Sequence, residues 1–228
     1  MNLDTYSIPD DLYLARGADV NPNRPAFTGD VYRDVEIPGV QAGGLALVVA
    51  HPCSFRVGAG QLADRLLLAA VETSTKQGAN AWGTRFFDRM PLTDVDGAGY
   101  WVGDLDKIGR SLTADLLTTD RLACLSEFGV NMLQQRLTFH LTRAEIPTAT
   151  FAAAFAHTFE EADLLEEWTD VLTDGGWSQA RAAAGFEQFI RSGEPSLQEK
   201  LLDPQQRSSV RRACRQQATL LVENQSAG

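Results

Sequence analysis

The feature that most constrains this sequence is a change in hydrophobic spacing at Ser126. Between Gly29 and Leu125, short β-like runs alternate with turn residues, whereas beyond Ser126 the apolar residues recur at helical spacing. Strands and helices that are segregated along a chain are typical of α+β proteins and not of a doubly wound sheet. Because the expected strands are short and lie within roughly 95 residues, we predict a small β-barrel followed by a helical C-terminal region.

The same pattern divides the chain into three parts. Residues 1–28 are predicted to form an irregular N-terminal arm, because prolines and an Asn-Pro-Asn turn interrupt them. Leu12 and Tyr13 are apolar enough to dock this arm on the body. Residues 29–145 are predicted to form the barrel domain with a closing helix, and residues 146–228 the helical region.

Three runs carry the clearest strand signals. Asp30–Pro38 alternates between apolar and polar residues, as half-buried strands do. Leu45–Ala50 is continuously apolar, which predicts a central strand buried on both faces. Leu66–Glu72 is the third candidate. Further short strands are expected within Ala81–Leu92, Tyr100–Leu105, Leu112–Leu117 and Thr119–Leu125.

Composition excludes several classes of protein. The chain has 30 acidic and 20 basic residues, a net charge of −10, which argues against non-specific nucleic-acid binding through bulk charge. The longest apolar run is far shorter than the ~20 residues that a bilayer demands. We expect a cytoplasmic protein that spans no membrane. The three cysteines include no Cys-x-x-Cys pair, and no phosphate-binding glycine motif occurs, so neither a metal nor another cofactor is predicted.

The strand section resembles the MazF/PemK-like toxins of toxin–antitoxin pairs. The similarity lies in the order of short segments over residues 29–143. Those segments are Gly29–Tyr32, Leu45–Val49, Leu67–Ser74, Met90–Leu92, Asp115–Leu122 and Leu125–Leu141. The resemblance implies an SH3-like barrel that forms a homodimer and cleaves single-stranded RNA without a metal.

The resemblance also implies a catalytic pair: an arginine in the loop before the second strand and a Thr/Ser after the third. In this sequence the loop Gly39–Gly44 contains no arginine. The Thr/Ser side is matched by Thr73, Ser74 and Thr75. Arg56 would replace the missing arginine only if its own loop folds back.

The segment His51–Arg56 (HPCSFR) holds the densest group of reactive side chains, directly after a predicted buried strand. His51 would suit a general base, and Arg56 would suit a phosphate clamp, which together favour attack by an RNA 2′-hydroxyl. Cys53 and Ser54 would contact the substrate, and Cys53 would be a nucleophile if a cation lowered its pKa. The structural alternative makes Cys53 a small buried residue and pairs His51 with a backbone carbonyl and Arg56 with an acid such as Asp64.

Two other groups of residues are candidates for binding the substrate. Thr75 and Lys76 would contact phosphate, or would form only a polar turn. Arg85 lies among Trp82, Phe86 and other aromatic residues, a combination that either stacks unpaired bases or packs in a core.

The C-terminal region contains an acidic helix and a later helix with Arg207, Arg211 and Arg215 at intervals of four. We predict that this basic stripe pairs with acidic residues, either on the acidic helix inside the same region or at an interface. The alternative is an acidic partner or a phosphate.

These observations lead to two functional hypotheses. The first is a divergent MazF/PemK-like protein of a toxin–antitoxin or bacterial defence module, an endoribonuclease with His51, Arg56, Thr73 and Ser74 in one cleft. Its partners would be single-stranded RNA and an antitoxin. The alternative is a non-catalytic barrel-plus-helices module that docks a partner protein, and the missing loop arginine favours it.

Overall fold

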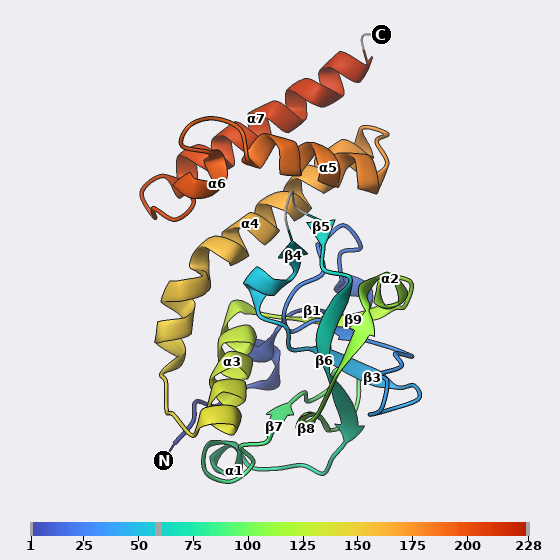
Figure 1. Cartoon of the computed structure of the whole chain (residues 1–228), viewed down its shortest axis with the longest axis vertical. Helices are drawn as coiled ribbons and strands as arrows, with labels where there is room; N and C mark the ends of the chain where they lie inside the picture. Colours follow the sequence, from blue (N-terminus) through green and yellow to red (C-terminus); the bar gives the residue numbers. More distant parts are fainter. Residues whose placement is uncertain (1, 58–60, 227–228) are drawn as a thin grey trace. The chain divides into compact units, whose positions relative to one another are not determined.

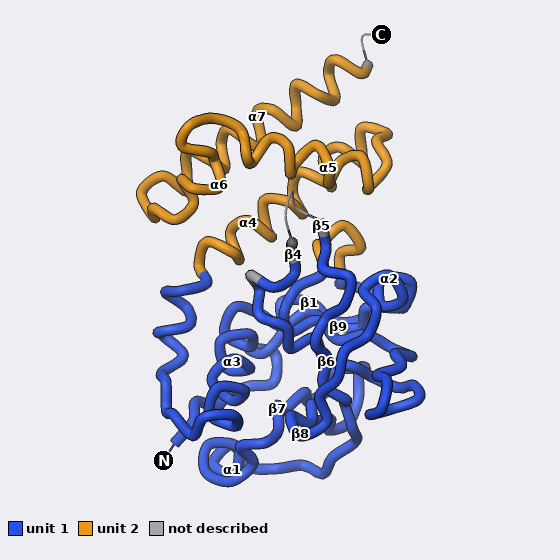
Figure 2. Tube along the Cα trace, viewed as in Figure 1, with its two compact units in different colours: residues 1–20, 26–155 blue, residues 21–25, 156–228 orange. Residues whose placement is uncertain are grey.

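The computed structural model describes residues 2–57 and 61–226, without the side chains of Cys53, Arg56, Val57, Gln61 and Ser226. The chain forms two compact units (Figure 2). Unit 1 comprises residues 1–20 and 26–155, and unit 2 comprises residues 21–25 and 156–228. Most of the predicted N-terminal arm is thus part of unit 1, and the main boundary lies ten residues beyond position 145.

Unit 1 is built on a curled, fully antiparallel seven-stranded sheet with the order β1-β9-β2-β3-β6-β8-β7 (Figure 1). Helices accompany the sheet, which confirms the α+β class. The strands of this sheet are β1 (Tyr13–Arg16), β2 (Val31–Tyr32), β3 (Leu45–Val48), β6 (Arg65–Thr73), β7 (Arg89–Pro91), β8 (Trp101–Leu112) and β9 (Arg121–Leu125). A separate two-stranded ribbon joins β4 (Arg56–Val57) and β5 (Gln61–Leu62).

The sheet curls without closing as a hydrogen-bonded barrel. Within the described residues, the edge strands β1 and β7 form no ladder with each other. Side chains join these edges instead: the Tyr13 hydroxyl donates to the Thr93 carbonyl at 3.0 Å, and Arg16 Nη1 donates to the Asp94 carbonyl at 3.3 Å. The SH3-like identity of this half-barrel stays a prediction.

The central strands form where the longest apolar runs occur. All four residues of β3 are buried, as predicted for Leu45–Ala50. Strand β6 pairs with it in the register Val48↔Leu68, and Leu66, Leu68 and Ala70 alternate into one core cluster. The opposite face of β6 carries Arg65 and Leu67, because successive side chains of a strand point to opposite faces.

One predicted strand is a helix, and another is only partly a strand. Ala81–Leu92 forms α1 (Ala79–Thr84) and then the short strand β7, and Leu112–Leu117 contains α2 (Thr113–Leu116). The amide of Leu3, in the N-terminal segment, donates to the carbonyl of Gly83 in α1 at 3.0 Å. Such tertiary contacts override the strand preference of the nearby aromatic residues.

The N-terminal segment contributes an edge strand and core residues. Its first elements are η1 (Pro9–Leu12), β1 and η2 (Gly17–Asp19). Leu12 is fully buried, and Tyr13 is buried and pairs with Leu125 in β9. Asp4 accepts hydrogen bonds from Gln135 and Thr148. The predicted docking through Leu12 and Tyr13 is confirmed, and the segment is irregular apart from these three short elements.

Helix α3 (Glu127–Thr142) lies beside the sheet in unit 1 (Figure 1). The side chain of Ser126 caps it by accepting a hydrogen bond from the Gly129 amide at 3.1 Å. Gly129 is required because a Cβ there would lie 2.3 Å from the Leu12 carbonyl oxygen. This close approach locks α3 against the N-terminal segment.

Unit 2 is helical, as predicted for the C-terminal region. Helix α4 (Thr148–Asp174) begins in unit 1 and continues through unit 2. Trp168 and Phe186 are at the centre of the unit 2 core. The other helices are α5 (Gln179–Ile190), α6 (Leu197–Lys200) and α7 (Arg207–Ser226).

The predicted internal charge pairing of unit 2 is confirmed for two arginines. Arg211 binds Glu160 at 2.6 Å, and Arg215 binds both carboxylate oxygens of Glu167. Arg207 instead donates to the Leu201 carbonyl. Across residues 2–57 and 61–226, no helix combines the length and apolar composition that a membrane span requires.

Candidate ligand-binding site

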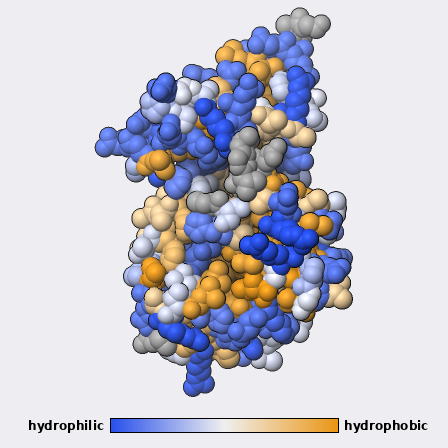
Figure 3. Space-filling model, viewed as in Figure 1, coloured by the Kyte–Doolittle hydropathy of each residue, from blue (hydrophilic) through white to orange (hydrophobic). Residues whose placement is uncertain are grey.

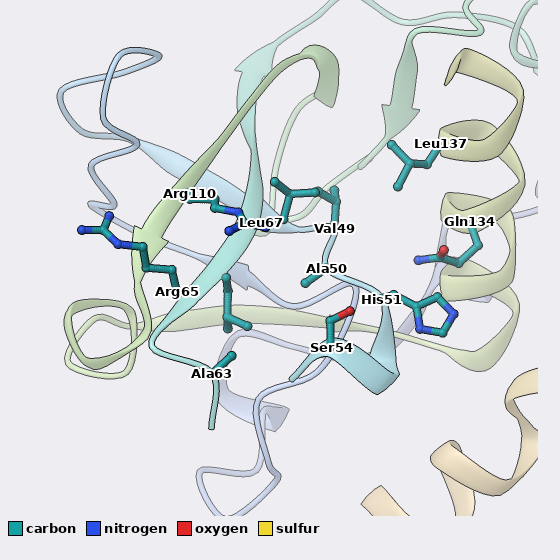
Figure 4. A pocket seen from close by; sticks show the side chains of 11 residues that line it. Val49, Ala50, His51, Ser54, Ala63, Arg65, Leu67, Arg110, Gln134 and Leu137 are labelled. Atoms are coloured by element: carbon teal, nitrogen blue, oxygen red, sulfur yellow. The ribbon is translucent and has the colours of Figure 1, made fainter. Parts of the chain in front are cut away.

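A cavity of about 480 Å³ opens in unit 1 where β3 ends (Figure 4). Its apolar walls come from Val49 and Ala50 after β3, from Leu67 on β6 and from Leu137 on α3. Viewed from outside, apolar atoms gather between α3 and strands β6 and β8, with strongly hydrophilic atoms beside them (Figure 3). We call this cavity the α3 pocket.

Two arginines line the sheet side of the α3 pocket: the Arg110 guanidinium lies next to Leu67, and the Arg65 guanidinium points outward (Figure 4). Arg65 is on β6 and Arg110 on β8, and the register pairs Leu67 with Arg110 and Arg65 with Leu112. Arg65, Leu67 and Arg110 therefore share one face of the sheet. Both arginines are exposed, and neither guanidinium has a carboxylate partner among the described residues. They leave ten N–H donors available to a ligand, five from each guanidinium.

Gln134 forms the polar part of the opposite wall. Its side chain projects from α3 into the α3 pocket, next to Leu137 (Figure 4). The residue is 5% exposed, and its Nε2 has no hydrogen-bond partner within the described part of the chain. The pocket thus contains a buried amide donor on its α3 side and the Arg110 guanidinium on its sheet side.

His51 lies at the rim of the α3 pocket, directly after β3. Its ring meets the edge of Phe155 with centroids 4.7 Å apart. The residue is exposed overall, and partial desolvation of the ring lowers the pKa of His51 below its ordinary value. Ser54 also lines the pocket, from the short helix η3 (Pro52–Ser54), whose backbone is held by a 2.7 Å bond from the Ser54 amide to the His51 carbonyl.

The structure does not bring Thr73 and Ser74 to this pocket. The amides of Val49 and Ala50 donate to the Leu67 carbonyl, so His51 lies near the start of β6. Thr73 is six residues further along the same strand, which is roughly 20 Å at 3.3 Å per residue. The predicted single cleft is therefore wrong, because antiparallel neighbours place their carboxyl ends at opposite edges of a sheet.

The other predicted binding residues are also away from the α3 pocket or only partly described. Thr75 and Lys76 follow Thr73 at the far end of β6, where Thr75 accepts a hydrogen bond from Gln77. Arg85 ends α1 and is exposed. The side chains of Cys53 and Arg56 lie outside the described residues, so their predicted roles stay predictions.

Sequence reasoning missed Arg65, Arg110 and Gln134. Arg65 precedes an apolar run and would have been found by asking which charged residue shares a face with Leu67. Arg110 becomes its neighbour only through the β6–β8 register. One feature could have marked Gln134 as a candidate site residue: it belongs to a cluster of polar residues in a helix that is buried around most of its surface.

The described residues contain no group of three His, Cys, Asp or Glu side chains that could hold a metal ion. No protein-family model matches this sequence, and no curated protein sequence is significantly similar to it.

Proposed function

We propose that unit 1 binds single-stranded RNA and takes one nucleotide into the α3 pocket. The observation that carries this proposal is the pair Arg65 and Arg110, two guanidinium groups without carboxylate partners, beside an apolar cavity with a buried amide donor. Guanidinium groups recognise phosphate through paired hydrogen bonds. The apolar walls supply a surface for a base.

The size and composition of the α3 pocket support a small organic anion over an inorganic one. A volume of about 480 Å³ falls within the range of ligand pockets. Val49, Leu67 and Leu137 give it apolar walls, which a phosphate ion alone would not need. A nucleotide combines an anionic group with a flat apolar base, and single-stranded RNA presents both without unpairing.

The net charge of −10 restricts how RNA would bind. A chain of this charge lacks the general attraction of a basic nucleic-acid-binding protein, so affinity would come from a few local contacts. Each phosphate contact on a single strand contributes about −0.7 to the slope of log K against log salt. Two contacts predict a slope of about −1.4.

The test is fluorescence anisotropy with a labelled RNA octamer of mixed sequence. We expect Arg65→Ala and Arg110→Ala each to weaken binding roughly tenfold and to reduce the salt slope. Arg33→Ala is the matched control, since Arg33 is exposed and follows β2 at the level of Leu45, the end of β3 remote from His51. Equal affinity in all three variants would refute the proposal.

Two further measurements extend the same experiment, one on the location of the site and one on the kind of ligand. Ser74→Ala tests the far end of β6 and is expected to leave RNA affinity unchanged. Competition by a mononucleotide at concentrations close to that of the RNA would instead show that a free nucleotide is the ligand.

A second candidate function is metal-independent cleavage of the bound RNA, favoured by the position of His51 at the pocket rim. Partial desolvation lowers the pKa of His51, which favours the neutral ring that a general base requires. His51 would take the 2′-hydroxyl proton, the 2′-oxygen would bond to phosphorus, and the 5′-oxygen would leave with a proton from water. A denaturing gel checks this: wild-type protein would produce fragments ending in cyclic phosphate, and His51→Gln would not.

A relationship to the MazF/PemK-like toxins, and with it an antitoxin partner and a homodimer, remains a proposal. The order of strands and the closing helix α3 support it. The separation of Thr73 from His51 counts against the catalytic pair of that family.

The alternative of a protein-docking module has weaker support from the helical unit. Arg211 and Arg215, the residues expected to attract an acidic partner, bind Glu160 and Glu167 within unit 2.

A further inference from the structure

Three consecutive polar residues of α3 are buried, and only two of them have a structural task. Gln135 Nε2 donates to Asp4 and to the Ile146 carbonyl. Arg136 donates to the Trp82 and Phe86 carbonyls. Gln134 is as buried as these neighbours, but its Nε2 meets no acceptor among the described residues.

A buried donor without an acceptor destabilises a fold, because the amide loses its bonds to water and gains none in return. Leucine would fill this position of α3 with a similar volume and no such cost. Gln134 points into the α3 pocket and not into the packed core (Figure 4). Its donor is therefore placed for an acceptor that enters the pocket from outside.

The position of this donor defines the acceptor. Arg110 lies on the sheet side of the α3 pocket next to Leu67, where a phosphate would bind, and Gln134 lies across the cavity on α3 beside Leu137 (Figure 4). Arg65 lines the same side, and its guanidinium points outward. A nucleotide with its phosphate at Arg110 would direct the edge of its base toward Gln134.

We infer that Gln134 selects bases in which a carbonyl lies next to a ring N–H, uracil and guanine, over cytosine and adenine; this rests on the proposed binding of RNA. In uracil and guanine a carbonyl oxygen lies next to a ring N–H. Gln134 Nε2 donates to that oxygen while Oε1 accepts from the N–H, a two-bond pattern of the kind by which side-chain amides read bases. Cytosine and adenine present an amino group at the corresponding position, so with the amide in the orientation that the structure shows, the buried donor would meet another donor.

The experiment compares oligo-U and oligo-C octamers by anisotropy, since uracil and cytosine differ chiefly in the carbonyl or amino group at one ring position. Wild-type protein is expected to bind oligo-U roughly tenfold more tightly. Gln134→Leu should reduce this ratio to about twofold or less, and Gln134→Glu, whose side chain only accepts when ionised, should shift it toward oligo-C.

Gln135→Leu is the matched control on the same helix. It removes the bonds to Asp4 and should lower the thermal stability of unit 1 while keeping the oligo-U preference. Gln134→Leu should keep or raise that stability. If Gln134→Leu instead lowered stability and weakened both oligonucleotides equally, Gln134 would be a structural residue and the inference would be wrong.

The outcomes separate this inference from the function on which it rests. Equal binding of oligo-U and oligo-C by wild-type protein, with binding still dependent on Arg65 and Arg110, would overturn the base preference alone. Absence of RNA binding would overturn both.

Discussion

Arg136 supports a sharp prediction about the stability of unit 1. It is a fully buried arginine on α3 that donates to four carbonyls: Phe86 at 3.0 Å, Arg89 at 3.2 Å, Trp82 at 2.9 Å and Asp4 at 3.5 Å. Burial lowers its pKa to about 10, so it stays charged at neutral pH. Its guanidinium joins the end of α1 and strand β7 to α3.

Arg136→Met keeps the apolar stem and removes these four bonds. A hydrogen bond from a charged donor contributes about 1.5–3 kcal/mol, and the buried carbonyls left behind add to the loss, whereas the cost of burying the charge is recovered. The expected net decrease in the free energy of unfolding is about 4 kcal/mol. For a chain of this size that corresponds to a fall in Tm of roughly 8–16 °C.

The assay is hydrogen exchange read by mass spectrometry, because it reports on unit 1 and unit 2 separately. Peptides covering α1 and β7 should lose protection in Arg136→Met, while the peptides of α5 and α7 keep theirs. Arg143→Met, an exposed arginine at the end of the same helix, is the control. A change of less than about 1 kcal/mol in Arg136→Met would show that the buried bonds only balance the cost of burying the charge.

Two further predictions concern packing and pH. Gly129→Ala places a Cβ 2.3 Å from the Leu12 carbonyl and should destabilise unit 1 by about 1–3 kcal/mol in a urea titration, whereas Gly43→Ala, with open space around it, should change little. Equal effects would contradict the close approach. The folded-state pKa of His51 is lowered, so protonation in acid favours the unfolded state. The contribution of His51 to the stability of the fold is therefore present above pH 6.5 and is lost as the pH falls from there toward the folded-state pKa. Thermal melts at pH 5 and pH 7 should therefore show a smaller acid-induced loss for His51→Gln than for wild type, and identical losses would refute this.

Much of the fold followed from local patterns. The apolar runs predicted β3 and β6, and the cap at Ser126 predicted α3, because burial of a continuous run and capping of a helix depend on residues close together in the chain. The pairing of Arg211 and Arg215 with the acidic helix was also predictable, since both partners repeat at helical intervals.

The binding site could not be predicted in the same way. The hypothesis of a cleft shared by His51 and Thr73 depended on which strand ends meet, and strand direction and register are set by contacts distant in sequence. Strand β1 illustrates the same point, because it pairs with β9 more than 100 residues later.

The spacing of apolar residues within a few positions was enough to predict where strands give way to helices and which runs are buried. The meeting of Arg65, Arg110 and Gln134 around one cavity depends on long-range contacts. The β6–β8 register brings the two arginines onto one face of the sheet, and the packing of α3 turns an amide toward the same cavity. No local preference of any of these three residues encodes that meeting.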